Sequence, residues 1–426
     1  MSQFNNILDV AEQLQVKRNY HKALKYLEKA QQIDQDDVRL NCLLARSLQE
    51  TNQHDLSEYH YNKALKSDPN HLGSLLGKVS LYFELGNPES HELLSKTQLI
   101  HATEPSVYFY KSMHSRLDSS DIQTCISLLS KNDVPTLHYA LGSAFDKLKQ
   151  YDRAYYHFVK ANDVQTSYKS KLSDVEANLT INTYTSDLIS GFSGHSSSRP
   201  IFVVGLPRSG TTLVEKVLSS HFKIGSGGEL SHMYDIFRSL SKTPFSALRD
   251  IDDCAVIKRA EKYLSLTNSI EGVHFVDKMP DNINMVGFIK ILFPNSKIVF
   301  CRRDKRDVAL SCWQSNFSVI RWANNFNDMS NKFSNFSKVV RHWENIGIDW
   351  LDLSYEDFVM DFDKGVSSLL NFVGVEYDTT CLEFYKAKSC VKTASLSQVR
   401  KPLYTSSVGR WKNYDAFLNS EFLSLS

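Results

Sequence analysis

Amphipathic helical spacing dominates the N-terminal third of the chain, and it repeats. The stretch from Tyr20 to Asp34 recurs 34 residues later as His54 to Asp68, with alanine at positions 30 and 64. Another copy stands 131 residues after the first, and its matching positions are Ala11 with Gly142, Tyr20 with Tyr151, Ala23 with Ala154, and Ala30 with Ala161. Small residues at such positions let paired helices approach closely, while Leu and Tyr fill the space between successive pairs. The pattern therefore predicts an α-solenoid of stacked helix pairs, with a degenerate middle around residues 85–105.

The pattern changes after residue 165. Residues 166–189 have a mixed helical pattern, and residues 190–198 are rich in Ser and Gly, which predicts a flexible break. Beyond this break, short apolar runs such as 200–205 and 297–301 are each followed by a turn and a helix, as buried parallel strands are. We expect a three-layer α/β domain with a mostly parallel sheet. The predicted organisation is an α-solenoid over 1–165, a helix and Ser/Gly-rich linker over 166–198, and the α/β domain over 199–426.

Composition narrows the class of protein. With 426 residues, 42% of them hydrophobic and 23% charged, the chain is expected to fold into more than one domain. Its 49 Lys and Arg balance 48 Asp and Glu, and this net charge of +1 argues against attraction of the whole molecule to nucleic acid or an anionic membrane. Any anion site must therefore be local.

The sequence also bears on location. No apolar stretch reaches the roughly 18 residues that a membrane helix needs, and the first 15 residues lack the basic and apolar regions of a secretory signal. We expect a cytoplasmic protein with no transmembrane segment. Seven scattered cysteines, none in a Cys-x-x-Cys pair, predict reduced thiols rather than disulfides or a zinc site.

A candidate phosphate loop follows the apolar run 200–205. Leu206 to Thr212 contains Gly210 and leads into an amphipathic helix, so several backbone N–H groups and the helix dipole converge on one point that suits a phosphate-like anion. Gly205 and Gly210 keep the spacing of the triphosphate loop GxxxxGK[ST], but Thr211 stands where its lysine belongs, which argues against an ordinary ATPase or kinase. Arg208 supplies a cation instead, and its planar guanidinium suits bidentate binding of phosphate or sulfate.

These residues resemble a known family. The stretch IFVVGLPRSGTTLVEKVLSSH, residues 201–221, is similar to the 5′-phosphosulfate loop of sulfotransferases that use 3′-phosphoadenosine-5′-phosphosulfate (PAPS). Its PRSGTT form most resembles protein-tyrosine sulfotransferases and bacterial sulfotransferases with tetratricopeptide repeats. The resemblance spans about residues 199–415, and residues 3–165 resemble tetratricopeptide repeats themselves. It implies PAPS as cosubstrate, bound at this loop by Arg208, Ser209, Gly210, Thr211 and Thr212.

The resemblance also implies a subsite for the 3′-phosphate of the donor. Arg303 and Ser311 match the family residues that bind this phosphate, while Ser315 stands where the family has a further cation. The neighbouring cations Arg302, Lys305 and Arg306 are expected to form a solvated basic turn.

Two further segments match donor contacts of the family. Tyr355 matches a nucleotide-contacting tyrosine, although a tyrosine of the core is an alternative. Residues 395–411 resemble the loop that closes over the donor, with Lys401 and with Arg410 in place of a terminal lysine. The alternative for this stretch is a mobile surface loop with Trp411 as a packing anchor.

Three residues are implied in catalysis. Glu229 lies 21 positions after Arg208, where the family has its general base, although dipole pairing at a helix start is an alternative. Lys278 matches the lysine that stabilises the leaving phosphate, with a surface lysine as the alternative, and Ser395 matches a second stabiliser. Asp277 resembles the magnesium-organising aspartate of a triphosphatase, but sulfuryl transfer needs no metal and we expect none.

The predicted function is transfer of a sulfuryl group from PAPS to an acceptor hydroxyl, for which a protein tyrosine is one candidate. A protein or peptide presented by the repeats, an oligosaccharide and a small hydroxylated metabolite all remain open as acceptors, and so does a homodimer. One rival is a phosphate-loop nucleotide kinase. Another is a non-catalytic module that senses nucleotide while its repeats recruit a partner.

Overall fold

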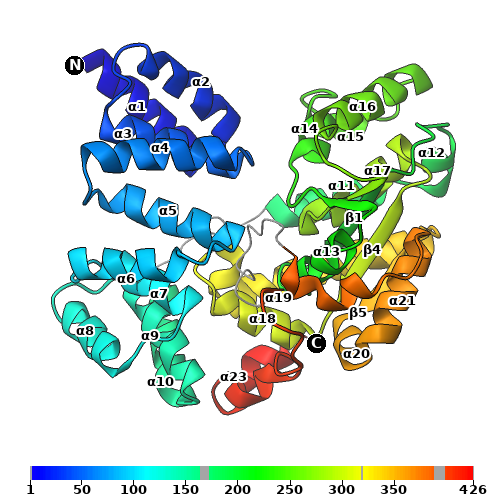
Figure 1. The fold of residues 1–426 in the computed structure, drawn as a ribbon. Coiled ribbons are helices and arrows are strands. Elements are labelled where there is room, and N and C mark those ends of the chain that lie inside the picture. Colours follow the sequence, from blue (N-terminus) through cyan, green and yellow to red (C-terminus); the bar gives the residue numbers. More distant parts are fainter. Residues whose placement is uncertain (1, 164–171, 318–319, 388–398, 426) are drawn as a thin grey trace. The chain divides into compact units, whose positions relative to one another are not determined.

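The computed structural model describes residues 2–163, 172–317, 320–387 and 399–425. The chain divides into two compact units, Met1–Lys147 and Leu148–Ser426 (Figure 1). No helix in the described ranges combines the length and the apolar character needed to cross a bilayer.

The first unit is a succession of antiparallel helices. They are α1 (Ser2–Val16), α2 (Tyr20–Gln31), α3 (Val38–Glu50), α4 (His54–Ser67), α5 (Leu72–Leu85), α6 (Ser90–Ile100), α7 (Pro105–His114), α8 (Ser119–Leu129) and α9 (Pro135–Lys147). The start of α3 is capped by Asp37, whose carboxylate accepts the N–H of Leu40 at 2.7 Å. Ala11, Ala23 and Ala30 are 0% exposed inside a cluster of leucines. The predicted close approach of small residues is confirmed.

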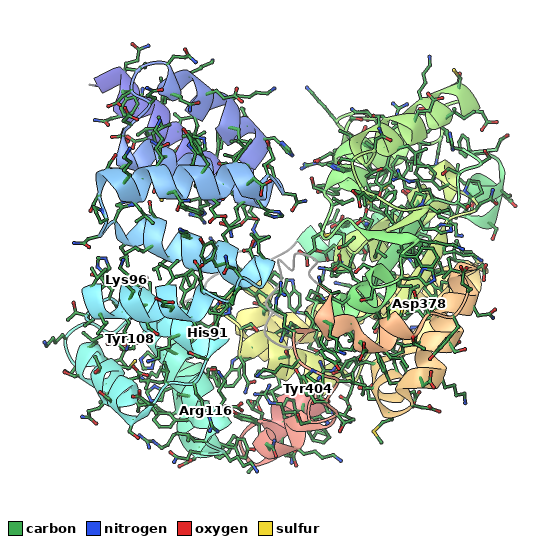
Figure 2. The ribbon with its side chains drawn as sticks, viewed as in Figure 1. His91, Lys96, Tyr108, Arg116, Asp378 and Tyr404 are labelled. Atoms are coloured by element: carbon green, nitrogen blue, oxygen red, sulfur yellow. The ribbon has the colours of Figure 1, made fainter. Side chains whose placement is uncertain are left out.

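Aromatic rings pack the degenerate middle of this unit. The ring of Phe83 in α5 stacks on His114 of α7, with centroids 3.8 Å apart, and meets His91 of α6 edge-on at 5.0 Å. His91 is labelled in Figure 2. Burial lowers the pKa of His114 to about 4, which makes its imidazole a neutral stacking partner near pH 7. Helix pairing therefore continues where the repeat pattern in the sequence fades.

The second unit is built on a five-stranded parallel sheet with the order β2-β3-β1-β4-β5. Its strands are β1 (Pro200–Gly205), β2 (Ile224–Ser226), β3 (His274–Asp277), β4 (Lys297–Arg302) and β5 (Leu351–Ser354). Every residue of the central strand β1 is buried, as its continuous apolar run predicts. The sequence did not predict β2, which has only three residues.

The other described elements of the second unit are α-helices and 3-10 helices. They are α10 (Tyr151–Asp163), α11 (Leu172–Thr183), α12 (Ser186–Ser190), α13 (Thr211–Ser219), α14 (His232–Arg238), α15 (Pro244–Ala247), α16 (Asp253–Leu266), η1 (Pro280–Met285), α17 (Val286–Leu292), α18 (Lys305–Trp313), η2 (Arg321–Asn324), α19 (Phe326–Asn345), α20 (Tyr355–Met360), α21 (Phe362–Val373), η3 (Thr379–Lys386), η4 (Arg410–Tyr414) and α23 (Asp415–Leu423). Phe202 and Phe300 face α16, α17 and α19 in one core cluster, while α13 packs on β1 from outside that cluster. The predicted three-layer α/β fold is confirmed.

The linker expected around residues 190–198 is fixed to the sheet domain. Ser193 donates its N–H and its hydroxyl to Asp253, both at 2.9 Å, and the N–H of His195 binds the carbonyl of Leu292 at 2.8 Å. A Cβ at Gly194, whose φ is +61°, would lie 2.5 Å from Pro294. The expected flexible break is therefore wrong for this stretch, because Ser and Gly here provide hydrogen bonds and close approach.

Helix α10 packs within the second unit. Tyr155 stacks on Phe417 with centroids 5.1 Å apart, Phe158 lies 5.6 Å from Trp313, and Asn162 donates to the carbonyl of Trp313 at 3.0 Å. The repeat pattern assigned this helix to the N-terminal domain, whereas compactness divides the chain after Lys147. The boundary near residue 165 stays a prediction.

Candidate active site

The residues singled out in the sequence follow the carboxyl ends of the parallel strands. Gly205 ends β1 and pairs with Cys301 of β4, so the phosphate loop and Arg303 leave the sheet side by side. Lys278 follows β3, which lies on the other side of β1, and Tyr355 follows β5, the edge strand next to β4. Ligands of open α/β sheets bind at the carboxyl ends of the strands, where the chain turns from strand to helix.

The phosphate loop has an unusual backbone. Arg208 has a φ of +70° and Gly210 a φ of +102°, both in the region that disfavours side chains. A Cβ on Gly210 would lie 2.6 Å from the ring of Tyr355, and one on Gly205 would lie 2.8 Å from Oγ of Ser209. Glycine is therefore required at both positions, because a Cβ would clash with its neighbours and because the positive φ disfavours other residues. Strained conformations of this kind concentrate at functional sites.

Gly210 also leaves the start of α13 open to a ligand. It is the residue before the helix and has no side chain to cap the N–H groups of the first turn. Thr211 and Thr212 form that turn and are 4% and 6% exposed. Ser209 is 1% exposed, and its Oγ has no hydrogen-bond partner among the described residues. The loop thus presents backbone and hydroxyl donors of the kind that bind phosphate or sulfate oxygens.

Residues from three elements meet at this loop. Nε of Arg208 donates to Oγ of Ser311 at 2.8 Å, and Nη1 of Arg303 donates to the carbonyl of Arg208 at 2.9 Å. The guanidinium of Arg303 also lies 4.5 Å from the centre of the Tyr355 ring. Burial, with smaller effects of Arg303 and Arg410, lowers the pKa of Arg208. Arginine nevertheless stays protonated, so the site concentrates positive charge.

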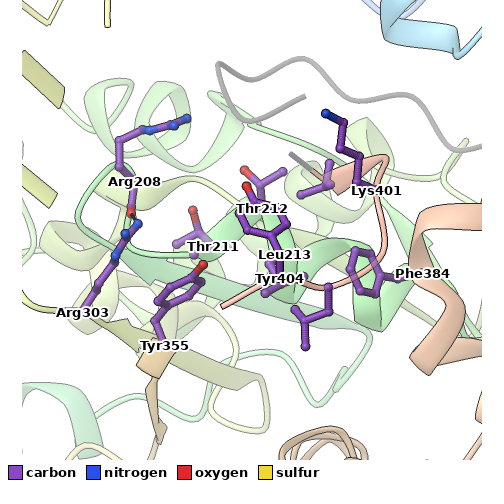
Figure 3. A pocket seen from close by; sticks show the side chains of 12 residues that line it. Arg208, Thr211, Thr212, Leu213, Arg303, Tyr355, Phe384, Lys401 and Tyr404 are labelled. Carbon is purple, nitrogen blue, oxygen red and sulfur yellow. Dashed lines mark hydrogen bonds between the residues drawn. The ribbon is translucent and has the colours of Figure 1, made fainter. Parts of the chain in front are cut away.

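A pocket opens in front of the loop. It is lined by Arg208, Gly210, Thr211, Thr212, Leu213, Arg303, Tyr355, Phe384, Val399, Lys401, Leu403 and Tyr404. In Figure 3, Arg208 and Arg303 lie at one side of this lining and Phe384 and Lys401 at the other. Its described lining contains three cationic side chains and no carboxylate, together with tyrosine and phenylalanine rings. This combination suits an anionic ligand that also has a flat, apolar part.

Glu229 and Lys278 form an ion pair beside the loop. Nζ of Lys278 lies 2.5 Å from Oε1 of Glu229, and the side chains are 1% and 40% exposed. A surface position for Lys278 is therefore wrong. Glu229 does not begin a helix either, because it lies in the turn between β2 and α14, which starts at His232. The pair unites a buried cation with a carboxylate that solvent and ligand can reach.

Asp277 is buried and hydrogen-bonded to α16. Its Oδ2 accepts the hydroxyl of Tyr263 in α16 at 2.7 Å, and the residue is 0% exposed. Burial, reinforced by Glu215, raises the pKa of Asp277 to about 7. This carboxyl group therefore belongs to the core of the sheet domain, where it is hydrogen-bonded to Tyr263.

Comparisons with known proteins identify the domain. Residues 200–379 match the model of the sulfotransferase family, and residues 38–71 match the tetratricopeptide repeat. The chain contains a sulfotransferase domain and a tetratricopeptide repeat.

Several individual proteins are similar to the chain. An uncharacterized protein of Aquifex aeolicus is 30% identical over 82% of this chain, and the chain spans 50% of that relative's length. A putative protein-tyrosine sulfotransferase of Caenorhabditis briggsae is 23% identical over 51% of this chain and 81% of its own length. The sulfotransferase domain of the Synechococcus PCC 7002 olefin synthase aligns at a TM-score of 0.40 with 21% identity, over 54% of this chain and 94% of its own.

A C-terminal segment of the second unit, residues 407–411, is held beside the pocket by hydrogen bonds to Asp307. This carboxylate accepts the N–H groups of Gly409 at 2.7 Å and of Trp411 at 2.9 Å, while Nη2 of Arg303 donates to the carbonyl of Ser407 at 2.7 Å. Trp411 also packs edge-on against Phe422, so it is an anchor. The segment that contains Lys401 and Arg410 is thus tied to the Arg303 turn.

The basic turn of the sulfotransferase domain divides into two parts. Arg302 is exposed and paired with Asp352 and Glu344, as expected of a solvated turn. Arg306, whose side chain is 41% exposed, pairs with Asp304 at 2.6 Å and also lies 3.8 Å from the centre of the Trp411 ring. Ser315 donates its hydroxyl to the carbonyl of Ser311 at 2.7 Å, and Ser395 lies outside the described residues.

The sequence did not single out two buried carboxylates, Glu215 and Asp307. Each follows a predicted site residue by four positions, Glu215 after Thr211 within α13, and Asp307 in α18 after Arg303, which precedes that helix. Both are nearly fully buried, at 4% and 2% exposure. For Glu215 the available signal was a carboxylate in the mainly apolar run 213–218, whereas Asp307 directly follows Arg306 and carried no such signal. Buried charges need partners.

Proposed function

We propose that the protein transfers a sulfuryl group from PAPS to the hydroxyl group of an acceptor. The observation that best supports this is the arrangement around β1. The cationic pocket of the phosphate loop lies where the chain leaves β1 and β4. On the other side of β1, Lys278 comes directly after β3, and it pairs with Glu229, which comes after β2. An anion site and an acid–base pair thus share one sheet edge, as transfer between a bound donor and a hydroxyl requires.

The donor is proposed to occupy the lined pocket. The N–H groups of Gly210 to Thr212, the hydroxyl of Ser209 and the guanidinium of Arg208 suit the 5′-phosphosulfate. Arg303, Ser311, Lys401 and Arg410 suit the 3′-phosphate, and the Tyr355 ring is available to the nucleotide. Arg303 at present donates to the carbonyls of Arg208 and Ser407. Nε of Arg303 is buried and has no hydrogen-bond partner among the described residues, so it can donate to the 3′-phosphate while both of these hydrogen bonds are kept.

The proposed reaction begins with the acceptor hydroxyl between the phosphosulfate and Glu229. Glu229 takes the hydroxyl proton as the acceptor oxygen forms a bond to sulfur, and the bond between sulfur and the bridging phosphate oxygen breaks. The products are a sulfate ester, 3′-phosphoadenosine-5′-phosphate (PAP) and a protonated Glu229. Lys278, together with Ser395, neutralises the charge that develops on the departing phosphate. A preorganised group of this kind lowers the barrier by about 2.7–4 kcal/mol.

The acceptor class is proposed as a tyrosine-bearing protein or peptide. Relatives named as protein-tyrosine sulfotransferases and the adjoining tetratricopeptide repeat support this choice. Saccharide and small hydroxylated acceptors would use the same donor site, so they belong in the same screen with labelled PAPS.

Binding of PAP, the product nucleotide, tests the donor site without knowledge of the acceptor. In calorimetric titration, we expect a Kd in the micromolar range or tighter that does not depend on magnesium. Arg303→Ala should weaken it at least tenfold, because one charged contact to phosphate is worth about 1.5–3 kcal/mol.

Lys278→Ala is the matched control for a cation at the same sheet edge. It should bind PAP more tightly than Arg303→Ala does, because it keeps the contacts proposed for the 3′-phosphate, but form PAP from PAPS roughly 100-fold more slowly than the wild type, or slower still. Preference for magnesium ATP, or no binding of either nucleotide, would overturn the proposed function. Near-normal turnover of folded Lys278→Ala would remove Lys278 from the mechanism.

A further inference from the structure

Glu215 links the phosphate-loop helix to the predicted catalytic pair. It lies one helical turn after Thr211, so the two residues share a face of α13. Thr211 lines the pocket, whereas the Glu215 side chain, 6% exposed, reaches the turn between β2 and Glu229. One helix therefore provides the anion site at its start and a buried carboxylate next to the proposed chemistry.

The carboxylate of Glu215 accepts two hydrogen bonds from the turn 226–228. Oε1 of Glu215 accepts the hydroxyl of Ser226 at 2.8 Å and the N–H of Gly228 at 3.0 Å. Gly228 has a φ of +69°, and its carbonyl accepts the N–H of Lys278 at 2.8 Å. Glu229 is the next residue along the chain. Its backbone position is thus fixed by a turn that is bound to Glu215 on one side and to Lys278 on the other.

The other carboxylate oxygen lies near the lysine. Oε2 of Glu215 is 3.9 Å from Nζ of Lys278, which is 1% exposed. A buried ammonium group needs a nearby negative charge. In the proposed reaction Glu229 becomes neutral when it accepts the proton. Glu215 then remains as the negative charge beside Lys278.

We infer that Glu215 is a positioning residue, which as a carboxylate holds the 226–228 turn and balances the charge of Lys278 so that Glu229 and Lys278 act together. The inference rests on the proposed function for its catalytic part. Glu215 itself does not touch the donor pocket, because it is absent from the described lining. Its loss should therefore lower turnover and leave binding of the donor nucleotide intact.

Three variants separate the hydrogen bonds that Glu215 accepts from the turn from the effect of its negative charge. Glu215→Ala removes both, whereas Glu215→Gln keeps an oxygen that can accept from Ser226 and Gly228 but has no charge. Glu376→Gln is the control, because it neutralises an exposed carboxylate of the same unit that pairs with Lys223 at 2.6 Å. Hydrogen–deuterium exchange of the 224–230 peptide, calorimetry with PAP, and PAP formation from PAPS are measured on the full-length chain. Turnover is measured with the screened acceptor and with water.

Glu215→Ala should speed exchange at Gly228 at least tenfold, whereas Glu215→Gln and Glu376→Gln should exchange like the wild type. Both Glu215 variants should lose about 10-fold to 100-fold in kcat, with KM for PAPS and Kd for PAP within about threefold of wild type. Glu376→Gln should match the wild type throughout.

Three results would overturn the role of Glu215. One is unchanged exchange at Gly228 in folded Glu215→Ala, and another is normal kcat in Glu215→Gln. A loss of PAP affinity in parallel with turnover would also overturn it, because the effect would then act through the donor pocket. Failure of the proposed function gives a different outcome, in which wild-type protein neither binds PAP nor cleaves PAPS. In that case, hydrogen exchange at Gly228 still tests whether Glu215 holds the turn 226–228.

Discussion

At the scale of single residues, the buried carboxyl group of Asp277 should make stability depend on pH. Burial raises its pKa to about 7 in the folded protein, from 3.8 as the ordinary value. Between about pH 4 and 7 the folded state therefore binds more protons than the unfolded state, so the free energy of unfolding falls as pH rises through this window. Above pH 7 this contribution is constant. Each pKa unit by which the folded and unfolded states differ changes the free energy of unfolding by about 1.4 kcal/mol.

Asp277→Asn tests this directly. The amide oxygen can still accept the Tyr263 hydroxyl, but the group no longer titrates. We expect the variant to gain stability relative to wild type as pH rises from 4.5 to 8, by at least about 1 kcal/mol. Urea unfolding at several pH values measures the free energy of unfolding of both proteins. Their difference at each pH removes the contribution of the titratable groups that the two proteins share. Parallel stability curves for the two proteins would contradict the raised pKa.

At the scale of elements, the buried Asp307 should control the C-terminal segment that borders the pocket. Asp307→Ala leaves the N–H groups of Gly409 and Trp411, both on half-buried residues, without their acceptor, and each loss costs at most the roughly 1–3 kcal/mol of a fully buried group. The segment should loosen, and PAP should bind at least tenfold more weakly, since Lys401 and Arg410 lose their fixed positions.

Asp352→Asn is the control for Asp307. Asp352 pairs with Arg302 at the surface, and such exposed pairs contribute about 0–1 kcal/mol. Calorimetry with PAP and hydrogen exchange over residues 405–412 should show wild-type behaviour in this control. If Asp307→Ala folds and binds PAP as tightly as the wild type, the segment does not depend on this carboxylate.

The elements also show how far the sequence predicts the site. Apolar runs followed by helices predicted β1, β3, β4 and β5, and parallel strands bring their carboxyl ends to one edge, so Arg208, Arg303, Lys278 and Tyr355 could be placed together. The three-residue strand β2 was missed because it is too short to show a pattern. Glu215 and Asp307 were missed for another reason. Their partners are backbone N–H groups 13 and more than 100 residues away, which no local spacing encodes.

At the scale of the whole molecule, the position of α10 decides where the chain divides. The repeat pattern places α10 with the solenoid, and its phase is correct because α10 begins at Tyr151 as α2 begins at the matching Tyr20. Its apolar side nevertheless packs on Trp313 and Phe417 in the second unit. A helix can thus keep the sequence of a repeat while its buried face contacts another fold.

Two truncations distinguish these divisions. A chain that starts at residue 148 keeps α10, and we expect it to fold and to bind PAP within about threefold of the full chain, since every described lining residue of the pocket is present. A chain that starts at residue 166 uncovers Trp313 and Phe417. Each lost aromatic contact of this kind costs about 1.5–3 kcal/mol, and about 2–4 °C in Tm is lost per kcal/mol for a domain of this size. Thermal unfolding should therefore place the shorter chain well below the longer one. Equal Tm values would mean that α10 belongs to the solenoid, as the repeat pattern predicts.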